Sequence, residues 1–443
     1  MRTTFVILSL LAAACARAAS PGFTGLEHAA VRLEAGQASG LEGVYVVSDT
    51  RGAYATYPSA TARWSSFGAS GAAYATPLEA EVRDGVSTVP LPLYGGGLIV
   101  EDGGQAVYFW VADYAAKPVD LRALAPAVAD RVPVACVFLA LTRDGCAAPM
   151  YYYTINGRRV EIDRGLEVTY TTLVYDSEAG RYVEAEHTVE LPSAGATLRV
   201  PAPLCDTRVR LEGDRFLRAW GEEQAVETAG TVRATAVAAA TSAEQQTRDV
   251  PNEQRPDGDG SALGGSAPCE ITFSAEVTDA VAFSEWQVSR SPDFDIVERS
   301  YNERAFATVF DEEGTFYVRF TAANAEGTCS AEGEVYTVAV GTSVLTCPNA
   351  FTPYTSPGVN DEWRVSYRSI TEFRCEIFNR WGTRVALLTD PSQGWDGRHG
   401  GRRAGAGVYY YVVRARGADG KEYRLSGDIN IIGSRERGSN VAE

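Results

Sequence analysis

The stretch Ile377-Phe378-Asn379-Arg380-Trp381-Gly382 has a residue pattern that is typical of a β-strand. Because successive side chains of a β-strand point to opposite faces, we expect Ile377, Asn379 and Trp381 on one face. Phe378 and Arg380 are expected on the other, and Gly382 is expected to end the strand. The stretch therefore predicts one strand of a β-sandwich.

The same kind of pattern recurs along the chain. Short runs of Val, Ile, Thr, Tyr and Phe are broken by Gly, Asp and Pro, and few stretches keep a helical period. Such strands are typical of β-sandwiches in series. The sequence predicts an all-β protein made of tandem immunoglobulin-like β-sandwich domains that end in a small β-sandwich domain.

Changes in composition suggest where the domains lie. The predicted units are a first sandwich over 20–122, a second over 123–225, a third over 226–343, a C-terminal domain over 344–436 and a disordered tail over 437–443. The third unit resembles immunoglobulin- or PKD-like domains. Residues 240–267 are poor in large apolar side chains and are predicted to be an exposed polar insertion. Within it, residues 257–261 have oxygen donors at calcium-loop spacing, but Ala262 and Pro268 occupy the positions of the required Gly and Glu, so no metal site is predicted.

The charge balance excludes some functions. The chain has 57 Asp and Glu against 40 Lys and Arg, a net charge of −17, which argues against nucleic-acid binding. Residues 344–443 hold 14 basic and 11 acidic side chains, so the excess of acid lies in the rest of the chain. The chain has three histidines, His28, His187 and His399, which argues against histidine metal sites and catalytic triads. No cofactor is predicted.

The N-terminus has the features of an export signal. Arg2 precedes an apolar run from Phe5 to Ala14 that is too short to span a bilayer. A signal peptide over 1–18, cleaved after Ala18, is predicted. The alternative is a lipobox at 12–15, in which Cys15 would be lipidated. No later stretch has 18 consecutive apolar residues, so no transmembrane helix is expected after signal removal.

Seven cysteines follow Cys15, and none forms a C-x-x-C pair, which favours disulfides in an oxidising compartment over zinc sites. The order Cys269, Trp286, Cys329 is typical of an immunoglobulin-like sandwich in which the Trp packs on a disulfide. It predicts a Cys269–Cys329 bridge. Cys347 and Cys375 lie near predicted strand starts and are also expected to pair.

The disulfide pairing of the cysteines in the second unit is harder to predict. Residues 143–145 are predicted to be the tip of a hairpin, which would place Cys136 and Cys146 too far apart for a disulfide. We therefore expect a Cys146–Cys205 bridge, with Cys136 as a buried thiol.

The last hundred residues contain several motifs in a defined order. They are Cys347–Pro353, Val359–Asp361, Ile377–Gly382, Gly394–Gly397, Gly405–Tyr411 and Ser426–Ile432. In this order they resemble the gliding-motility-associated (type B) C-terminal sorting domain of Bacteroidetes type IX secretion cargo, over residues 344–436. The resemblance assigns the sorting motif to Asn379, Arg380, Trp381, Gly382, Trp395, Asp396, Gly397, Gly407, Tyr409 and Gly427.

The resemblance implies a route. The protein would enter the periplasm, fold, and be carried across the outer membrane by the type IX secretion translocon, which would recognise the folded domain and not a linear tag. It would then be held at the cell surface or released. Residues 354–358 lack the acidic side chains usual after the Phe-Thr-Pro motif, which weakens any metal site there.

For the remaining domains we expect a non-enzymatic role in adhesion or envelope interaction, with a surface glycan or a protein as ligand. One alternative is a regulator that reports secretion status through a periplasmic sensor. Another is a β-sandwich hydrolase, but its candidate carboxylates sit in no recognisable catalytic motif. These carboxylates are Asp293, Asp295, Asp311, Glu312 and Glu313.

Overall fold

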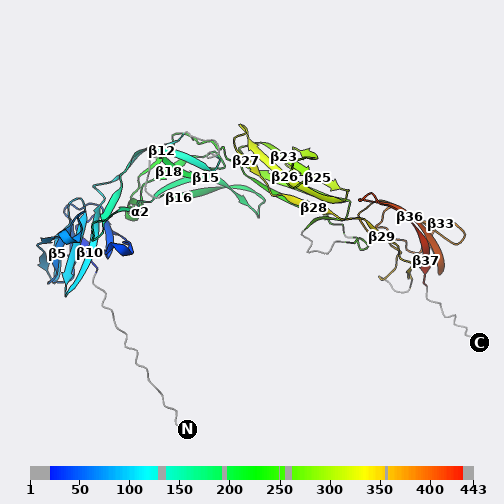
Figure 1. Ribbon diagram of the computed structural model, residues 1–443, viewed down its shortest axis with the longest axis horizontal. Coiled ribbons are helices and arrows are strands. Elements are labelled where there is room, and N and C mark those ends of the chain that lie inside the picture. Colours follow the sequence, from blue (N-terminus) through cyan, green and yellow to red (C-terminus); the bar gives the residue numbers. More distant parts are fainter. Residues whose placement is uncertain are drawn as a thin grey trace, which may run out of the picture. The chain divides into compact units, whose positions relative to one another are not determined.

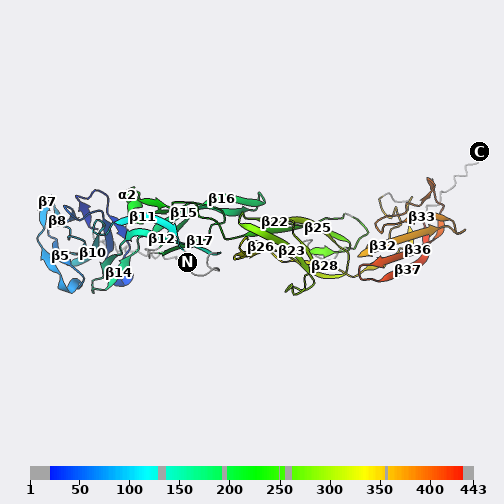
Figure 2. The same ribbon diagram turned by 90° about the horizontal axis from the view of Figure 1, so that it is seen from above.

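The computed structural model describes residues 20–127, 136–191, 197–248, 250–254, 262–354 and 358–432. Nearly all regular structure in these ranges is β-strand (Figures 1 and 2), which confirms the predicted fold class. The described α-helix, α2 (Arg215–Trp220), is short, and the Asp214 side chain caps it by accepting hydrogen bonds from the backbone N–H groups of Phe216 and Leu217. The contacts divide the chain into two compact units, Met1–Thr172 with Glu184–Arg233, and Leu173–Val183 with Ala234–Glu443.

The first sandwich packs a four-stranded sheet on a six-stranded one. The four strands, in spatial order, are β1 (Gly22–Thr24), β4 (Tyr54–Tyr57), β8 (Val86–Pro90) and β7 (Glu81–Arg83). The six are β2 (Val31–Leu33), β3 (Gly43–Val47), β10 (Gln105–Asp113), β9 (Gly96–Asp102), β5 (Arg63–Phe67) and β6 (Thr76–Leu78). Alternate residues of β10 enter different cores, Phe109 facing the four-stranded sheet and Trp110 facing away. Because both faces are covered, β3 is buried along its whole length.

The second sandwich lies in the same compact unit. One sheet has β11 (Val119–Pro126), β12 (Phe138–Ala147) and β17 (Thr197–Pro201). The other has β16 (Arg181–Leu191), β15 (Leu166–Asp176), β18 (Val209–Glu212) and β19 (Ala225–Glu227), with a separate hairpin of β13 (Met150–Tyr153) and β14 (Arg159–Ile162). The expected hairpin tip at residues 143–145 is wrong, because β12 runs through them. They instead pair with β11 at a register shift between Leu121 and Ala123.

The first two sandwiches share a core. Trp110 of β10 and Tyr153 of β13 have ring centroids 5.4 Å apart. The backbone of Ile155, just beyond β13, donates to Ser39 O (3.1 Å) and accepts from Ala72 N (2.7 Å). The apolar cluster that contains Trp110 continues into the second sandwich, so the predicted boundary at 122–123 crosses a common core.

A buried ion pair lies in this unit. The side chains of Arg164 and Asp214 are both 0% exposed, and Arg164 Nε donates to Asp214 Oδ2 over 2.6 Å. Arg164 Nη1 also donates to the carbonyl oxygens of Lys117 (2.7 Å) and Ala148 (2.8 Å). Tyr114 OH donates to the other carboxylate oxygen of Asp214 over 3.3 Å. The pair thus ties the helix cap to three other segments of the unit.

The third sandwich is built around Trp286. Its smaller sheet has β20 (Ala239–Gln245), β22 (Cys269–Val277) and β25 (Ala305–Phe310). Its larger sheet has β21 (Leu263–Gly265), β28 (Tyr336–Val340), β26 (Gly314–Asn324), β23 (Val281–Ser289) and β24 (Arg299–Tyr301), with β27 (Ser330–Glu332) also pairing with β26. Trp286 is fully buried and packs against Phe273 and Phe320.

The prediction of an exposed loop over 240–267 is wrong at both ends. Ala239–Gln245 is strand β20, which pairs with β22 along its length, and Leu263–Gly265 is strand β21. Small and polar side chains suffice here because alternate residues of β20 are partly buried while the others face solvent. The candidate calcium loop at 257–261 lies outside the described residues.

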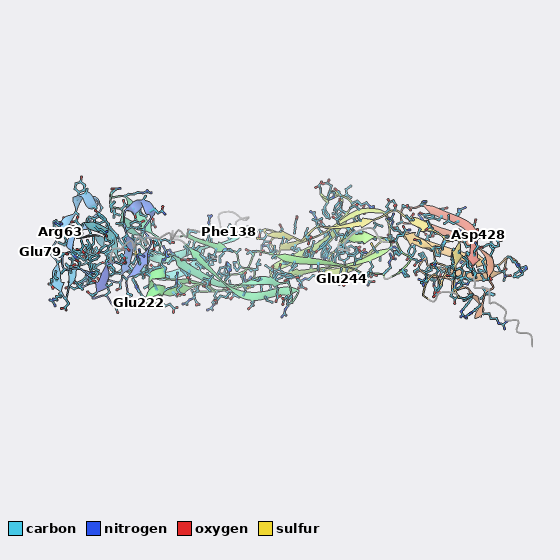
Figure 3. The ribbon with its side chains drawn as sticks, turned by 90° about the horizontal axis from the view of Figure 1, so that it is seen from below. Arg63, Glu79, Phe138, Glu222, Glu244 and Asp428 are labelled. Carbon is cyan, nitrogen blue, oxygen red and sulfur yellow. The ribbon has the colours of Figure 1, made fainter. Side chains whose placement is uncertain are left out.

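The C-terminal module is a separate sandwich in the second unit. Its main sheet has, in order, β30 (Ala350–Phe351), β37 (Glu422–Ile431), β36 (Gly407–Gly417), β32 (Ile370–Phe378) and β33 (Arg384–Leu388). Two smaller sheets are β29 (Val344–Thr346) with β31 (Ser366–Arg368), and β34 (Arg398–His399) with β35 (Arg402–Arg403). Figure 2 shows β32, β36 and β37 side by side, and Figure 3 labels Asp428 on β37.

Candidate functional site in the C-terminal module

The turn after β32 presents an exposed tryptophan. Asn379 Oδ1 accepts hydrogen bonds from the backbone N–H groups of Trp381 and Thr383, each over 3.0 Å. Two backbone hydrogen bonds, Asn379 N to Thr383 O (2.9 Å) and Gly382 N to Asn379 O (3.0 Å), close the turn. Gly382 has φ of 78°, a left-handed conformation that other residues adopt only at a cost. Asn379 and Gly382 therefore fix the backbone that carries Trp381.

Trp381 itself does not belong to the core. Its side chain is 74% exposed, and the Arg380 guanidinium lies 4.3 Å from the centre of its ring, in a cation–π contact. The expectation that Trp381 shares a strand face with Ile377 is wrong, because the strand ends at Phe378 and the chain turns at Asn379. An ordered, exposed aromatic side chain of this kind is typical of a binding surface.

Trp395 has the opposite role. It is 3% exposed and contacts the rings of Phe351 (5.5 Å between centroids) and Tyr409 (5.0 Å). Its backbone exchanges two hydrogen bonds with that of Trp363, and its Nε1 donates to Arg398 O over 2.9 Å. Trp395 is therefore part of the module's core.

The other residues assigned to the motif shape the backbone. Asp396 Oδ1 accepts from Arg398 N over 3.0 Å, and Gly397 O accepts from the hydroxyl of Tyr354. Tyr409 OH donates to Gly405 O over 3.1 Å, close to Gly407 at the start of β36.

Gly427 lies directly opposite Tyr411 in the pairing of β36 and β37. A Cβ atom at position 427 would come within 2.8 Å of the Tyr411 hydroxyl oxygen, so glycine leaves the space that this ring fills. The motif thus combines residues that build the fold with an exposed turn at 379–383.

Cys347 and Cys375 are both free thiols, so the bridge predicted between them is wrong. Cys375 is buried in the middle of β32, whereas Cys347 follows β29 and hydrogen-bonds with the Tyr411 side chain. Burial raises the pKa of the Cys375 thiol to about 12 and that of Cys347 to about 11. Both are therefore unreactive thiols at neutral pH.

The predicted Cys269–Cys329 bridge is also wrong. Cys269 is a buried free thiol, and burial raises its pKa to about 11. It begins β22 opposite Phe310, whereas Cys329 lies in the turn after β26, beyond Asn324. These positions are at opposite ends of the sandwich, much farther apart than the roughly 4 Å between Cβ atoms that a disulfide allows.

The remaining cysteines differ from expectation as well. Cys136 and Cys329 are both disulfide-bonded, so Cys136 is not the buried thiol that was expected. Cys205 is a buried thiol that donates to Thr171 O over 3.6 Å, which contradicts the Cys146–Cys205 bridge. That pairing depended on a hairpin tip at 143–145, and β12 has no turn there.

The module is joined to the third sandwich by polar contacts that sequence reasoning missed. Ser369 N donates to Ser266 Oγ (2.9 Å), and Ser369 Oγ accepts from Ala267 N (3.2 Å). Asn252 Nδ2 donates to the carbonyl oxygens of Val365 (2.7 Å) and Pro391 (2.8 Å). Asn252 belongs to the segment predicted as an exposed loop, and nothing in its local pattern marks it as a docking residue.

Hydrogen bonds also hold in place the segment that connects the third sandwich to the C-terminal module. Ser343, just before β29, is 6% exposed, and its Oγ donates to Asp419 Oδ1 over 2.7 Å. Tyr423 OH donates to Ser343 O over 2.9 Å, and Gly341 N donates to Gly265 O over 2.9 Å. The chain between the third sandwich and the module is therefore packed structure.

Other candidate sites show less organisation. In the parts of the chain that the structure describes, no three His, Cys, Asp or Glu side chains are placed to hold a metal ion. None of the helices in those parts is long and apolar enough to cross a membrane. The predicted signal peptide at 1–18, Cys15, the tail at 437–443 and the side chain of Cys146 lie outside the described residues.

Two family models match the chain. Residues 345–431 match the CHU_C type IX secretion signal domain, and residues 129–228 match a fibronectin type III domain. The fold and these matches define a β-sandwich protein that carries a type IX secretion signal domain, as the motif order predicted. Such a domain implies export to the cell surface or secretion. A comparison with curated proteins finds no match.

The chain is also similar to several solved structures, at low sequence identity and low TM-score. The chain is similar to a tetra-tandem repeat in the extending region of a large adhesion protein, with 15% identity, a TM-score of 0.21, and coverage of 88% of this chain and 99% of that one. It is similar to dimeric latent PorU from Porphyromonas gingivalis, with 11% identity, a TM-score of 0.16, and coverage of 74% and 35%. It is also similar to the FN1–FN3 domains of chicken CNTN1, with 11% identity, a TM-score of 0.21, and coverage of 71% and 99%.

Proposed function

We propose that this protein is a gliding-motility-associated cargo of the type IX secretion system of a Bacteroidetes bacterium. A signal peptide over residues 1–18 would direct it to the periplasm, and the translocon would then recognise the folded C-terminal module. The match of residues 345–431 to a type IX secretion signal domain is the observation that carries this proposal.

The proposed recognition uses the turn at 379–383 as its anchor. Trp381 is 74% exposed, yet four hydrogen bonds fix the backbone around it. A pre-ordered aromatic residue loses little entropy when a partner covers it, which is why such residues dominate binding energies. Asn379, Arg380 and Gly382 would act by holding Trp381 in place.

We expect Trp381→Ala to lower surface delivery of the full-length protein at least tenfold, as loss of a hot-spot residue worth about 2 kcal/mol would. The stability of the isolated protein should change by less than about 0.5 kcal/mol, because the side chain is exposed. Cell fractionation and urea unfolding would measure the two effects.

Tyr74→Ala is the matched control, since Tyr74 is a 77% exposed aromatic residue of the first sandwich and should have no part in export. Trp395→Ala should instead lower the free energy of unfolding of the module by about 3–5 kcal/mol, because it empties a core position. Normal surface delivery of Trp381→Ala would show that the turn is not the anchor.

For the domains before the module we propose a non-enzymatic role in adhesion or envelope interaction. Tandem sandwiches present loops at their ends, where binding residues are concentrated. The loop between β8 and β9 exposes Leu93 (66%) and Tyr94 (80%) at one such end. This apolar loop is of the kind that binds a surface glycan or a protein, and the match of residues 129–228 to a fibronectin type III domain supports a binding module.

A further inference from the structure

The third sandwich has an open edge along strand β25. Its smaller sheet is ordered β20, β22, β25, so β25 is an end strand, and among the described strands it pairs with β22 alone. End strands present unpaired backbone groups, and most proteins protect them with charged side chains, prolines or short length. The other end strands of five or more residues in the described sheets each contain a charged side chain; they are β11, β16, β17, β20 and β33. Strand β25, with the sequence Ala-Phe-Ala-Thr-Val-Phe, has no charge and no proline.

The backbone hydrogen bonds show which residues of β25 face the open edge. Arg304 O accepts from Ala275 N of β22 over 2.8 Å. In an antiparallel strand the N–H and C=O of one residue point the same way, and successive residues alternate. Arg304 and every second residue after it therefore face β22. The backbone N–H and C=O groups of Ala305, Ala307 and Val309 point to the open edge, and the side chains of these three residues are exposed.

The two ends of β25 differ in charge. At its start Arg304 is exposed and makes no ion pair with the described residues. At its end the surface has a hollow of about 670 Å³. The charged side chains that line the hollow are five acidic and two basic: Asp311, Glu312, Glu313, Glu372, Asp419, Arg290 and Arg416. The two arginines each pair with one of these acids, which leaves an excess of three negative charges. The hollow therefore has both the room and the charge to accept a basic side chain.

We propose that β25 binds a second copy of this chain, with the two β25 strands antiparallel about a two-fold axis at Thr308. In this register Ala307 lies opposite Val309 of the second copy, so residues whose backbone groups point to the edge meet each other and can hydrogen-bond. Arg304 lies opposite Glu312 of the second copy, at the rim of the acidic hollow. The inference does not depend on the proposed function.

Charge favours this register over its neighbour. A two-fold axis at Ala307 would also match the hydrogen-bonding groups, but it would set Glu303 opposite Asp311 of the second copy. Like charges directly opposite one another on paired strands destabilise a sheet, and that register has no pair of opposite charges to offset them. The proposed axis sets Glu303 opposite Glu313, but there the attraction of Arg304 for the hollow offsets the repulsion.

The same features favour a second copy over other ligands. A cation could fill the hollow, but it would leave the backbone groups of the edge unpaired. An occupant of both needs an uncharged strand with small outward side chains and a basic residue just before it, and β25 with Arg304 is such a strand. Two identical strands that pair antiparallel form a closed two-fold interface, so association stops at a dimer.

The size of the contact predicts a weak dimer. A strand of six residues is about 20 Å long, and a two-sheet sandwich with its side chains is about 20 Å thick, so two copies would bury roughly 800 Å² in total. Specific interfaces of this size are weak and transient. We therefore expect a dissociation constant of roughly 10–100 µM.

The first test is sedimentation equilibrium of the purified full chain at concentrations up to about 500 µM, where we expect a reversible monomer–dimer equilibrium. Ala307→Pro should remain monomeric throughout, because proline removes an N–H that the second copy needs and its ring blocks the approach. That N–H does not bond to β22, so the fold should be kept. Circular dichroism and the urea unfolding midpoint would check the fold.

Ala243→Pro is the matched control, on the other end strand of the same sheet. There Gln246 N donates to Glu270 O of β22 over 2.9 Å, so by alternation the N–H of Ala243 also points away from β22. This variant should dimerise as the wild type does.

Charge reversal is the second test, and it also tests the register. Arg304→Glu should weaken dimerisation at least tenfold, and adding Glu312→Arg should restore it to within about threefold of the wild type. Arg402→Glu makes the same charge change on exposed strand β35 and should dimerise as the wild type does. Because these side chains are exposed, the charge variants should fold, and they decide the question even if Ala307→Pro does not fold.

Three results would overturn the inference. The first is a wild-type chain that stays monomeric up to about 500 µM. The second is a dimer that Ala307→Pro leaves intact, since the two copies would then associate elsewhere. The third is an Arg304→Glu variant that dimerises as tightly as the wild type.

Discussion

Deleting residues 344–443 is expected to leave the protein in the periplasm, with surface delivery reduced at least a hundredfold. The reason is that the deletion removes the whole module that the translocon would recognise, including the exposed turn at 379–383. Fractionation of cells into surface, outer-membrane and periplasmic pools would measure the effect. Surface display of the truncated protein at wild-type level would contradict the role given to the module.

The structure adds a control to this experiment. Removing the module also removes Ser369 and Val365, which accept hydrogen bonds from Ala267 N and Asn252 Nδ2 of the preceding segment. The truncated protein should therefore also be less stable in its third sandwich. If the truncated protein in the periplasm resists protease, it is still folded. Its failure to reach the surface would then be due to the loss of the export signal and not to the loss of the fold.

Breaking the buried ion pair between Arg164 and Asp214 is the second large effect. We expect Asp214→Ala to lower the free energy of unfolding of its unit by about 3–5 kcal/mol, since an unpaired Arg164 would remain buried at 0% exposure. Asp214→Ala also removes the cap of α2. Urea unfolding followed by tryptophan fluorescence would report the change.

Two variants make this measurement specific. The exposed pair of Arg83 and Glu81 is 3.3 Å apart, and Arg83→Ala should cost no more than about 1 kcal/mol. The double variant Arg164→Met with Asp214→Leu should recover much of the loss, because an apolar pair of similar volume does not leave a buried charge. A loss below about 1 kcal/mol for Asp214→Ala would show that the pair does not hold the unit together.

The strand patterns predicted the fold well because they report burial, which alternates with a period of two in any half-buried sheet. Trp286 was expected in a core, and it is buried in one. These features depend on local sequence and on the simple need to bury large apolar side chains.

The errors have a different physical origin. The pattern of Ile377, Asn379 and Trp381 continues past the point where the strand ends. The chain turns there because the Asn379 side chain accepts from two backbone N–H groups and Gly382 adopts a left-handed conformation. Residues 143–145 have turn-like composition, yet they continue strand β12 and pair with Leu124, Ala123 and Leu121 of β11, whose extra residue at the register shift is Arg122.

The cysteines could not be paired from sequence, since pairing depends on which end of a sandwich each residue reaches. Cys269 and Cys329 follow the immunoglobulin-like order but lie at opposite ends of the third sandwich. Likewise, the small and polar residues at 250–254 gave no sign that Asn252 would bind two carbonyl oxygens of the C-terminal module. Such contacts are decided by tertiary structure.

The most direct measurement is a transfer experiment in a bacterium with a working type IX secretion system. A periplasmic reporter with its own signal peptide would be fused to residues 234–443, which keep the module together with the third sandwich on which it docks. The account predicts that the reporter reaches the cell surface or the medium, and that Trp381→Ala in the fusion retains it in the periplasm. A folded fusion that stays in the periplasm, while the full-length protein is exported by the same cells, would contradict the claim that this module is the export signal.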